Sequence, residues 1–135
     1  SWEVMSGELF EESDRVDLMI PDGEPQGISR TIQVDRQGRL FDVRVQVDIA
    51  HTYIGDLRVW LTSPQGQLFV LHDRQGGSTD NLVKDYGPAV APGLSELIGT
   101  DIGGDWTLCV ADMSRMDVGQ LKSWGMKLHY EPASR

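Results

Sequence analysis

The segment 41–49 alternates strictly between apolar and polar residues. Polar side chains occupy the even positions and apolar side chains occupy the odd ones, which are Phe41, Val43, Val45, Val47 and Ile49. A period of two places one kind of side chain on each face of a β-strand, whereas a helix would spread the apolar residues around its circumference. The pattern therefore predicts a strand with one face in a core and one in water, which is typical of antiparallel sheets.

Further strands are predicted on both sides of this segment. Residues 57–62 form a second strand that ends at the Pro64 and Gly66 turn, and residues 68–72 are expected to return as its hairpin partner. Gly38 is expected to play a similar turning role between residues 31–34 and the long alternating strand. Residues 106–110 and 121–130 alternate again near the end of the chain.

The rest of the chain is harder to assign. Residues 73–105 are rich in glycine, proline and polar side chains, and we expect functional loops together with strands that the pattern does not show. Within them, residues 93–99 suggest a helical turn or a short strand, and residues 2–18 could be an edge strand or a linker remnant. Seven or more short strands without an amphipathic helix predict an all-β antiparallel fold, either a sandwich or a jelly roll.

The expected organisation is one sandwich over residues 20–131, preceded by the segment 1–19 and followed by a tail at 132–135. At 135 residues one hydrophobic core is sufficient. The side chains that we expect to be largely buried in it are Val45, Val47, Leu61, Trp106, Leu108 and Trp124.

Composition excludes several classes of partner. The formal net charge of −9 opposes binding to nucleic acid or to an anionic lipid surface. No run of residues approaches the ~20 apolar positions that span a bilayer, and an export signal, if the parent protein is secreted, is expected upstream of Ser1. The single cysteine, Cys109, permits no intrachain disulfide and is interpreted as a small packing residue.

Catalytic signatures are missing from the sequence. His51, His72 and His129 are not accompanied by a Gly-x-Ser-x-Gly elbow, a His-Glu-x-x-His helix or a Ser-x-x-Lys set. We interpret His51 and His72 as polar residues at strand ends and His129 as lying on the outer side of the last strand. No catalytic or cofactor-binding residue is therefore assigned, and the glycine pairs at 76–77 and 103–104 are interpreted as turns rather than phosphate cradles.

Calcium is the one cofactor for which the sequence offers ligands. Reversing turns place the ends of strands 41–49 and 68–72 at the same side of a sandwich, so loop 51–56 should lie near loop 73–81. If loop 112–119 joins them, hard oxygen ligands come from Asp73, Asp80, Asn81, Asp112 and Asp117. The alternative is that these side chains cap turns.

Trp60 is the candidate interface residue. It is out of phase with the apolar Leu57, Val59 and Leu61, so it should lie on the opposite face of its strand. An aromatic side chain in that position is suited to contact with another domain or with a ligand.

The order of motifs resembles the P domain of proprotein convertases and related bacterial subtilisin-like peptidases. The matching segments are Ile-Pro-Asp at 20–22, His-Thr-Tyr-Ile-Gly-Asp-Leu at 51–57, Leu-Thr-Ser-Pro-Gln-Gly at 61–66, Gly-Asp-Trp-Thr-Leu at 104–108, and the closing set between Val110 and Leu128. Several convertases carry Arg-Gly-Asp where this chain has Ile54-Gly55-Asp56, so no adhesion role is carried over, and Asp56 is interpreted as a structural turn residue.

The resemblance implies a jelly-roll β-sandwich without catalytic residues of its own, attached to a secreted subtilisin-like serine peptidase. Its expected partner is the adjacent catalytic domain in the same chain, which it stabilises and helps to fold. One alternative is an extracellular module that binds carbohydrate or protein beside another hydrolase. A second is an independent hydrolase, which would need a Ser or Asp within hydrogen-bond reach of a histidine in a concave pocket.

Overall fold

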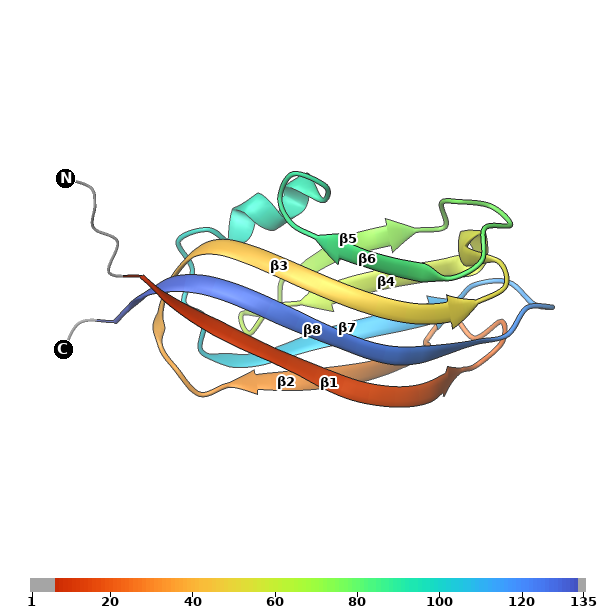
Figure 1. Ribbon diagram of the computed structural model, residues 1–135, viewed down its shortest axis with the longest axis horizontal. Coiled ribbons are helices and arrows are strands. Elements are labelled where there is room, and N and C mark those ends of the chain that lie inside the picture. The colour runs from red at the N-terminus through yellow and green to blue at the C-terminus, as the bar shows by residue number, and fades with distance from the viewer. Residues whose placement is uncertain (1–6, 134–135) are drawn as a thin grey trace.

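The computed structural model describes residues 7–133, and in that part of the chain eight β-strands form two four-stranded antiparallel sheets that pack face to face (Figure 1). The first sheet has the order β1 (Glu8–Ile20), β8 (Gly119–Pro132), β3 (Gly38–His51) and β6 (Leu82–Tyr86). The second has the order β2 (Ile28–Val34), β7 (Gly104–Asp112), β4 (Leu57–Thr62) and β5 (Leu68–Asp73). The predicted all-β jelly-roll sandwich is confirmed.

The long alternating strand is present as β3, but its phase changes once. Val43, Val45, Val47 and Ile49 are buried as predicted, whereas Phe41 is 45% exposed, so its assignment to the core was wrong. A register irregularity between Leu40 and Asp42 inserts one extra residue opposite β8, and Leu40 takes the inward position in place of Phe41.

The turn before β3 is also different from the prediction. Gly38 does begin β3, but β2 pairs with β7 in the second sheet while β3 pairs with β8 and β6 in the first. The short connection 35–37 therefore crosses between the sheets and does not close a hairpin. A Cβ at Gly38 would lie 2.5 Å from the carbonyl oxygen of Glu131, so the close pairing with β8 requires glycine there.

The hairpin between β4 and β5 forms as expected. The two strands pair antiparallel, and Gly66 in their turn has a φ of 87°, in the region that glycine adopts without strain. Within region 73–105 the structure has one short strand, β6, and one 3₁₀ helix, η2 (Pro92–Leu97). Of the two alternatives for residues 93–99, a helical turn or a short strand, the helical turn is present.

The six side chains predicted for the core are all buried, with exposed fractions of 3% or less. Trp106 of β7 and Trp124 of β8 lie on the inward faces of different sheets. The indole N–H of Trp106 donates a hydrogen bond of 2.9 Å to the carbonyl oxygen of Ile102, which satisfies its polar group inside the core. Within residues 7–133 no helix is long and apolar enough to cross a bilayer.

The N-terminal segment contributes an edge strand, which was one of the two alternatives for it. β1 pairs with β8 along its length, and its residue Asp14 reaches across to β2 of the other sheet. There it accepts two hydrogen bonds from the Arg30 guanidinium, at 2.9 and 3.1 Å. The hydrogen bond from Arg30 lowers the pKa of Asp14, and the pair closes the sandwich along this edge.

Candidate functional site

Three loops meet at the end of the sandwich where β3, β5 and β7 terminate (Figure 1). The Gly55 N–H in the β3–β4 loop bonds to the carbonyl of Gly77 in the β5–β6 loop at 2.9 Å. The Met113 N–H in the β7–β8 loop bonds to the carbonyl of Asp56 at 2.7 Å. The expected proximity of loops 51–56 and 73–81 is confirmed, and the condition that loop 112–119 joins them is met. We refer to these three segments as the loop cluster.

The centre of the loop cluster is a buried pair of side chains, His51 and Asp112. The Nε2 atom of His51 lies 3.0 Å from the Oδ2 atom of Asp112, and both side chains are fully buried. The Nδ1 atom of His51 accepts the backbone N–H of Tyr53 at 3.0 Å, so the ring proton must reside on Nε2, where it is donated to the carboxylate. The other carboxylate oxygen accepts the backbone N–H of Ser114 at 3.1 Å.

This arrangement leaves no ring nitrogen of His51 for a nucleophile. One nitrogen is engaged by a backbone amide and the other by a carboxylate, so among residues 7–133 no serine or threonine hydroxyl is hydrogen-bonded to the ring as a hydrolytic triad would need. The pair was not found from the sequence because its members are 61 residues apart and belong to no local motif. The hydrogen bond between the two side chains joins the end of β3 to the end of β7.

Two of the other residues proposed as calcium ligands, Asn81 and Asp117, bond to His51 or to the residue that follows it. The Asn81 side-chain oxygen accepts the backbone N–H of His51 at 3.1 Å, and Asp117 accepts the hydroxyl proton of Thr52 at 2.8 Å. Asp73 and Asp80 are exposed. Across the described residues no three His, Cys, Asp or Glu side chains are grouped so that they could hold a metal ion. Asn81, Asp112 and Asp117 thus have the capping contacts that were the alternative, and calcium binding stays a prediction.

Asp56 in the loop cluster and His72 near the end of β5 are two further buried polar residues at this end of the sandwich. Asp56 ends the short 3₁₀ helix η1 (Ile54–Asp56), and burial raises the pKa of its carboxyl, with further contributions from the carboxylates of Asp112 and Asp117. We expected this carboxylate to accept backbone N–H bonds, but the hydrogen bonds that hold the turn run through the Asp56 backbone, to Tyr53 and Met113. Asp56 therefore forms part of the turn through its main chain. His72 donates from Nε2 to the carbonyl of Ile54 at 2.9 Å, and so caps the same turn.

Trp60 lies on the outer face of the second sheet, as its phase predicted. Leu57, Val59 and Leu61 are fully buried, while Trp60 is half-buried and the guanidinium of Arg58 lies 5.9 Å from its ring centroid. Cys109 pairs directly with Trp60 across β4 and β7 and is also half-buried on this face, so it packs outside the core. Partial burial raises the pKa of its thiol.

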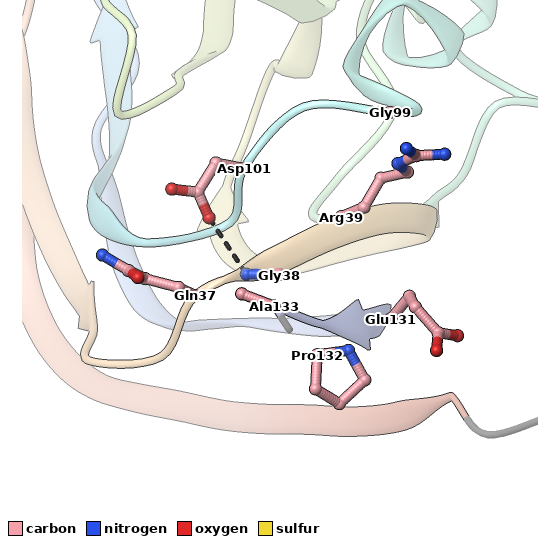
Figure 2. A pocket seen from close by; sticks show the side chains of 8 residues that line it. All are labelled: Gln37, Gly38, Arg39, Gly99, Asp101, Glu131, Pro132 and Ala133. Carbon is pink, nitrogen blue, oxygen red and sulfur yellow. Dashed lines mark hydrogen bonds between the residues drawn. The ribbon is translucent and has the colours of Figure 1, made fainter. Parts of the chain in front are cut away.

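An open pocket of about 520 Å³ occurs at the opposite end of the sandwich. Figure 2 shows it between the start of β3, the end of β8 and the segment around Gly99 and Asp101. The Asp101 carboxylate accepts the backbone N–H of Gly38 at 3.0 Å and that of Gly103 at 3.3 Å. This carboxylate therefore fixes the backbone that forms the pocket wall.

Comparison with known proteins gives the same family that the motif order suggested. A sequence model of the proprotein convertase P-domain matches residues 40–128. The calcium-dependent protease of Trichormus variabilis is 37% identical over 114 residues, which cover 82% of this chain and 17% of that protein. Leupeptin-inactivating enzyme 1 of Streptomyces exfoliatus is 37% identical over 123 residues, which cover 90% of this chain and 26% of that protein.

Solved structures agree on the fold. A serine protease of Aeromonas sobria superposes with a TM-score of 0.74 at 17% identity, over 93% of this chain and 27% of that one. The chain thus spans between 17% and 27% of the length of these three proteins. Most of each of them lies outside the region that this chain matches.

Proposed function

Because the chain belongs to the proprotein convertase P-domain family, we propose that it is a non-catalytic accessory domain of a larger secreted peptidase of the subtilisin-like serine type. In this proposal it stabilises the adjacent catalytic domain and supports its folding. The observation that most supports this proposal is the share of each protein that is matched. Relatives named as a protease and as a leupeptin-inactivating enzyme match 82% and 90% of this chain, yet both are much longer than it.

The interior of the domain supports this role. The His51 and Asp112 pair is fully buried, and both ring nitrogens of His51 are engaged by groups that are not nucleophiles. The side chains of the loop cluster bond to one another and to loop backbone, which favours a rigid scaffold over a reacting centre. The protein's contribution to peptidase chemistry is therefore proposed to be indirect.

A binding module for carbohydrate or protein is the alternative, and Trp60 is its candidate platform. A sugar that stacked on this indole would compete with the Arg58 guanidinium, which already lies near the ring. Binding to a glycan array that is lost in Trp60→Ala would favour this alternative.

Calcium binding is considered because the Trichormus relative is named a calcium-dependent protease. The loop cluster contains the candidate oxygen ligands, but Asn81, Asp112 and Asp117 already accept hydrogen bonds in it. As arranged, these residues do not converge on a shared cation site. No step of the proposed function is therefore assigned to calcium.

The proposal is tested by expressing the parent enzyme with and without this segment. We expect deletion to lower soluble yield and to shorten the half-life at elevated temperature, because an interface within one chain, commonly ~600–1,500 Å², would be lost. Activity per titrated active site should change much less in the molecules that survive. An unchanged yield and half-life would contradict the scaffold role.

A further inference from the structure

The two outer faces of the sandwich differ in charge. On the second sheet, strand pairing aligns two adjacent rows of outward side chains across all four strands. One row is Thr31, Thr107, Thr62 and Leu68, and the other is Ser29, Cys109, Trp60 and Val70. None of these eight residues carries a charge, and we call them the Trp60 face.

The outer face of the first sheet is mixed, because Phe41 and Val83 are 45% and 71% exposed there. It carries ion pairs between neighbouring strands, with Lys127 3.8 Å from Glu11 and Arg44 3.9 Å from Asp85. These ion pairs are exposed to water, and they distinguish this face from the uncharged rows of the second sheet. In a chain with 24% charged residues and a net charge of −9, eight outward positions would carry about two charges even at the average frequency, and more at surface frequency.

The composition of the Trp60 face is that of an interface core. Charged residues are depleted and aromatic residues enriched in the centre of protein interfaces, while the rim is polar. Leu68 is 53% exposed and Val70 is 39% exposed, so apolar surface faces outward beside the indole. Charged residues belong to the ends of the face, with Arg58 and Asp73 beyond the Trp60 row and Asp105 beyond the Thr107 row. The Arg58 guanidinium extends back from its end and lies 5.9 Å from the Trp60 ring centroid.

We propose that the Trp60 face is the surface against which the catalytic portion of the parent polypeptide packs. This inference rests on the proposed function and adds the location of the contact. The occupant follows from the lengths of the relatives, in which a region several times larger than this domain belongs to the same chain.

The size of the face fits that occupant. With strands ~4.8 Å apart and residues ~3.4 Å apart along each strand, the two rows cover about 270 Å², or about 500 Å² with the charged positions at both ends. Counting both partners, about 1,000 Å² would be buried, which lies within the ~600–1,500 Å² of domain interfaces in one chain.

Protection from oxidation tests the contact without relying on activity. Hydroxyl-radical footprinting of the isolated chain and of the intact parent should show Trp60 and Leu68 at least threefold less oxidised in the parent. Val83, which is 71% exposed on the edge strand β6, is the internal control and should react equally in both. Equal oxidation of Trp60 and Leu68 in both proteins would overturn the proposal.

A charge placed on the face gives a second test. Thr62→Lys on β4 should leave the melting temperature of the isolated chain within about 2 °C but shorten the thermal half-life of the parent severalfold. The matched control is Gln46→Lys, a half-buried polar residue on β3 that faces outward from the other sheet, and it should leave both unchanged.

The outcomes separate this inference from the proposed function. If deletion of the domain shortens the half-life and Thr62→Lys does not, the scaffold role stands and the Trp60 face is not the contact. If neither change matters, both proposals fail. A concentration-dependent dimer of the isolated chain that Thr62→Lys dissolves would assign the face to a second copy, and a glycan affinity lost in that variant would assign it to carbohydrate.

Discussion

Replacing Trp106 by alanine tests the core of the sandwich against its surface. Trp106 is fully buried on β7, and its indole N–H holds the carbonyl of Ile102 at 2.9 Å. The change removes the largest side chain from the inward face of the second sheet and leaves that carbonyl without its partner. Trp60, on the neighbouring strand β4, offers the matched control because it is the same residue type on the outward face.

The expected magnitude follows from the burial. An aromatic side chain buries ~200 Å², which at ~25 cal/mol per Å² gives an upper value of ~5 kcal/mol. Measured aromatic-to-alanine replacements in cores cost ~3–5 kcal/mol, so we expect the free energy of unfolding to fall by about 4 kcal/mol. At ~3–5 °C per kcal/mol for a domain of this size, the melting temperature should fall by about 12–20 °C. Trp60→Ala should cost about 1 kcal/mol or less.

Urea unfolding of the isolated domain, followed by circular dichroism, measures both variants. Trp106→Phe should fall between them, because phenylalanine keeps most of the core volume but cannot donate to Ile102. Equal and small losses for Trp106→Ala and Trp60→Ala would refute the assignment of strand phase in β4 and β7.

Burial raises the pKa of Tyr86 to about 12, and its hydroxyl has no hydrogen-bond partner among the described residues. The unfolded tyrosine ionises first, near 10, so stability should fall as pH rises from about 10 towards 12, and Tyr86→Phe should reduce this slope without lowering stability at pH 7. Asp112→Ala leaves the buried Nε2–H of His51 without a hydrogen-bond partner and should lower the free energy of unfolding in urea by about 3 kcal/mol. A decrease below about 1 kcal/mol would argue against the buried pair. The calcium hypothesis for the loop cluster predicts binding heat and a raised melting temperature when chelator-treated protein is titrated with millimolar calcium, and the absence of both would remove the site.

The sequence predicted the sandwich well where strands have one solvent-exposed face and one buried face. Residues 57–62 and 106–110 show this alternation, and both are strands with the expected inward side chains. β6 was not recognised because its three central residues, Val83 to Asp85, are all exposed and show no period of two. The bulge that exposes Phe41 depends on pairing with β8, which is distant in the chain, so no local pattern could reveal it.

The candidate site was predicted in position but not in detail. The meeting of loops 51–56 and 73–81 followed from strand direction alone, whereas the approach of loop 112–119 was only a condition of the calcium hypothesis. The bond between His51 and Asp112 depends on two strands from different sheets ending at the same place, and this requires the full topology. The uncharged rows around Trp60 depend on strand order and register in the same way.

The most direct test of the accessory role is scanning calorimetry of the intact parent enzyme carrying Trp106→Ala. The substitution lies inside the domain core, so it cannot touch substrate or reacting groups. If this domain stabilises the catalytic domain, the catalytic transition should shift to lower temperature together with the weakened sandwich, and Trp106→Phe should shift it less. A catalytic transition that keeps its temperature while the sandwich unfolds ~12–20 °C earlier would contradict the account.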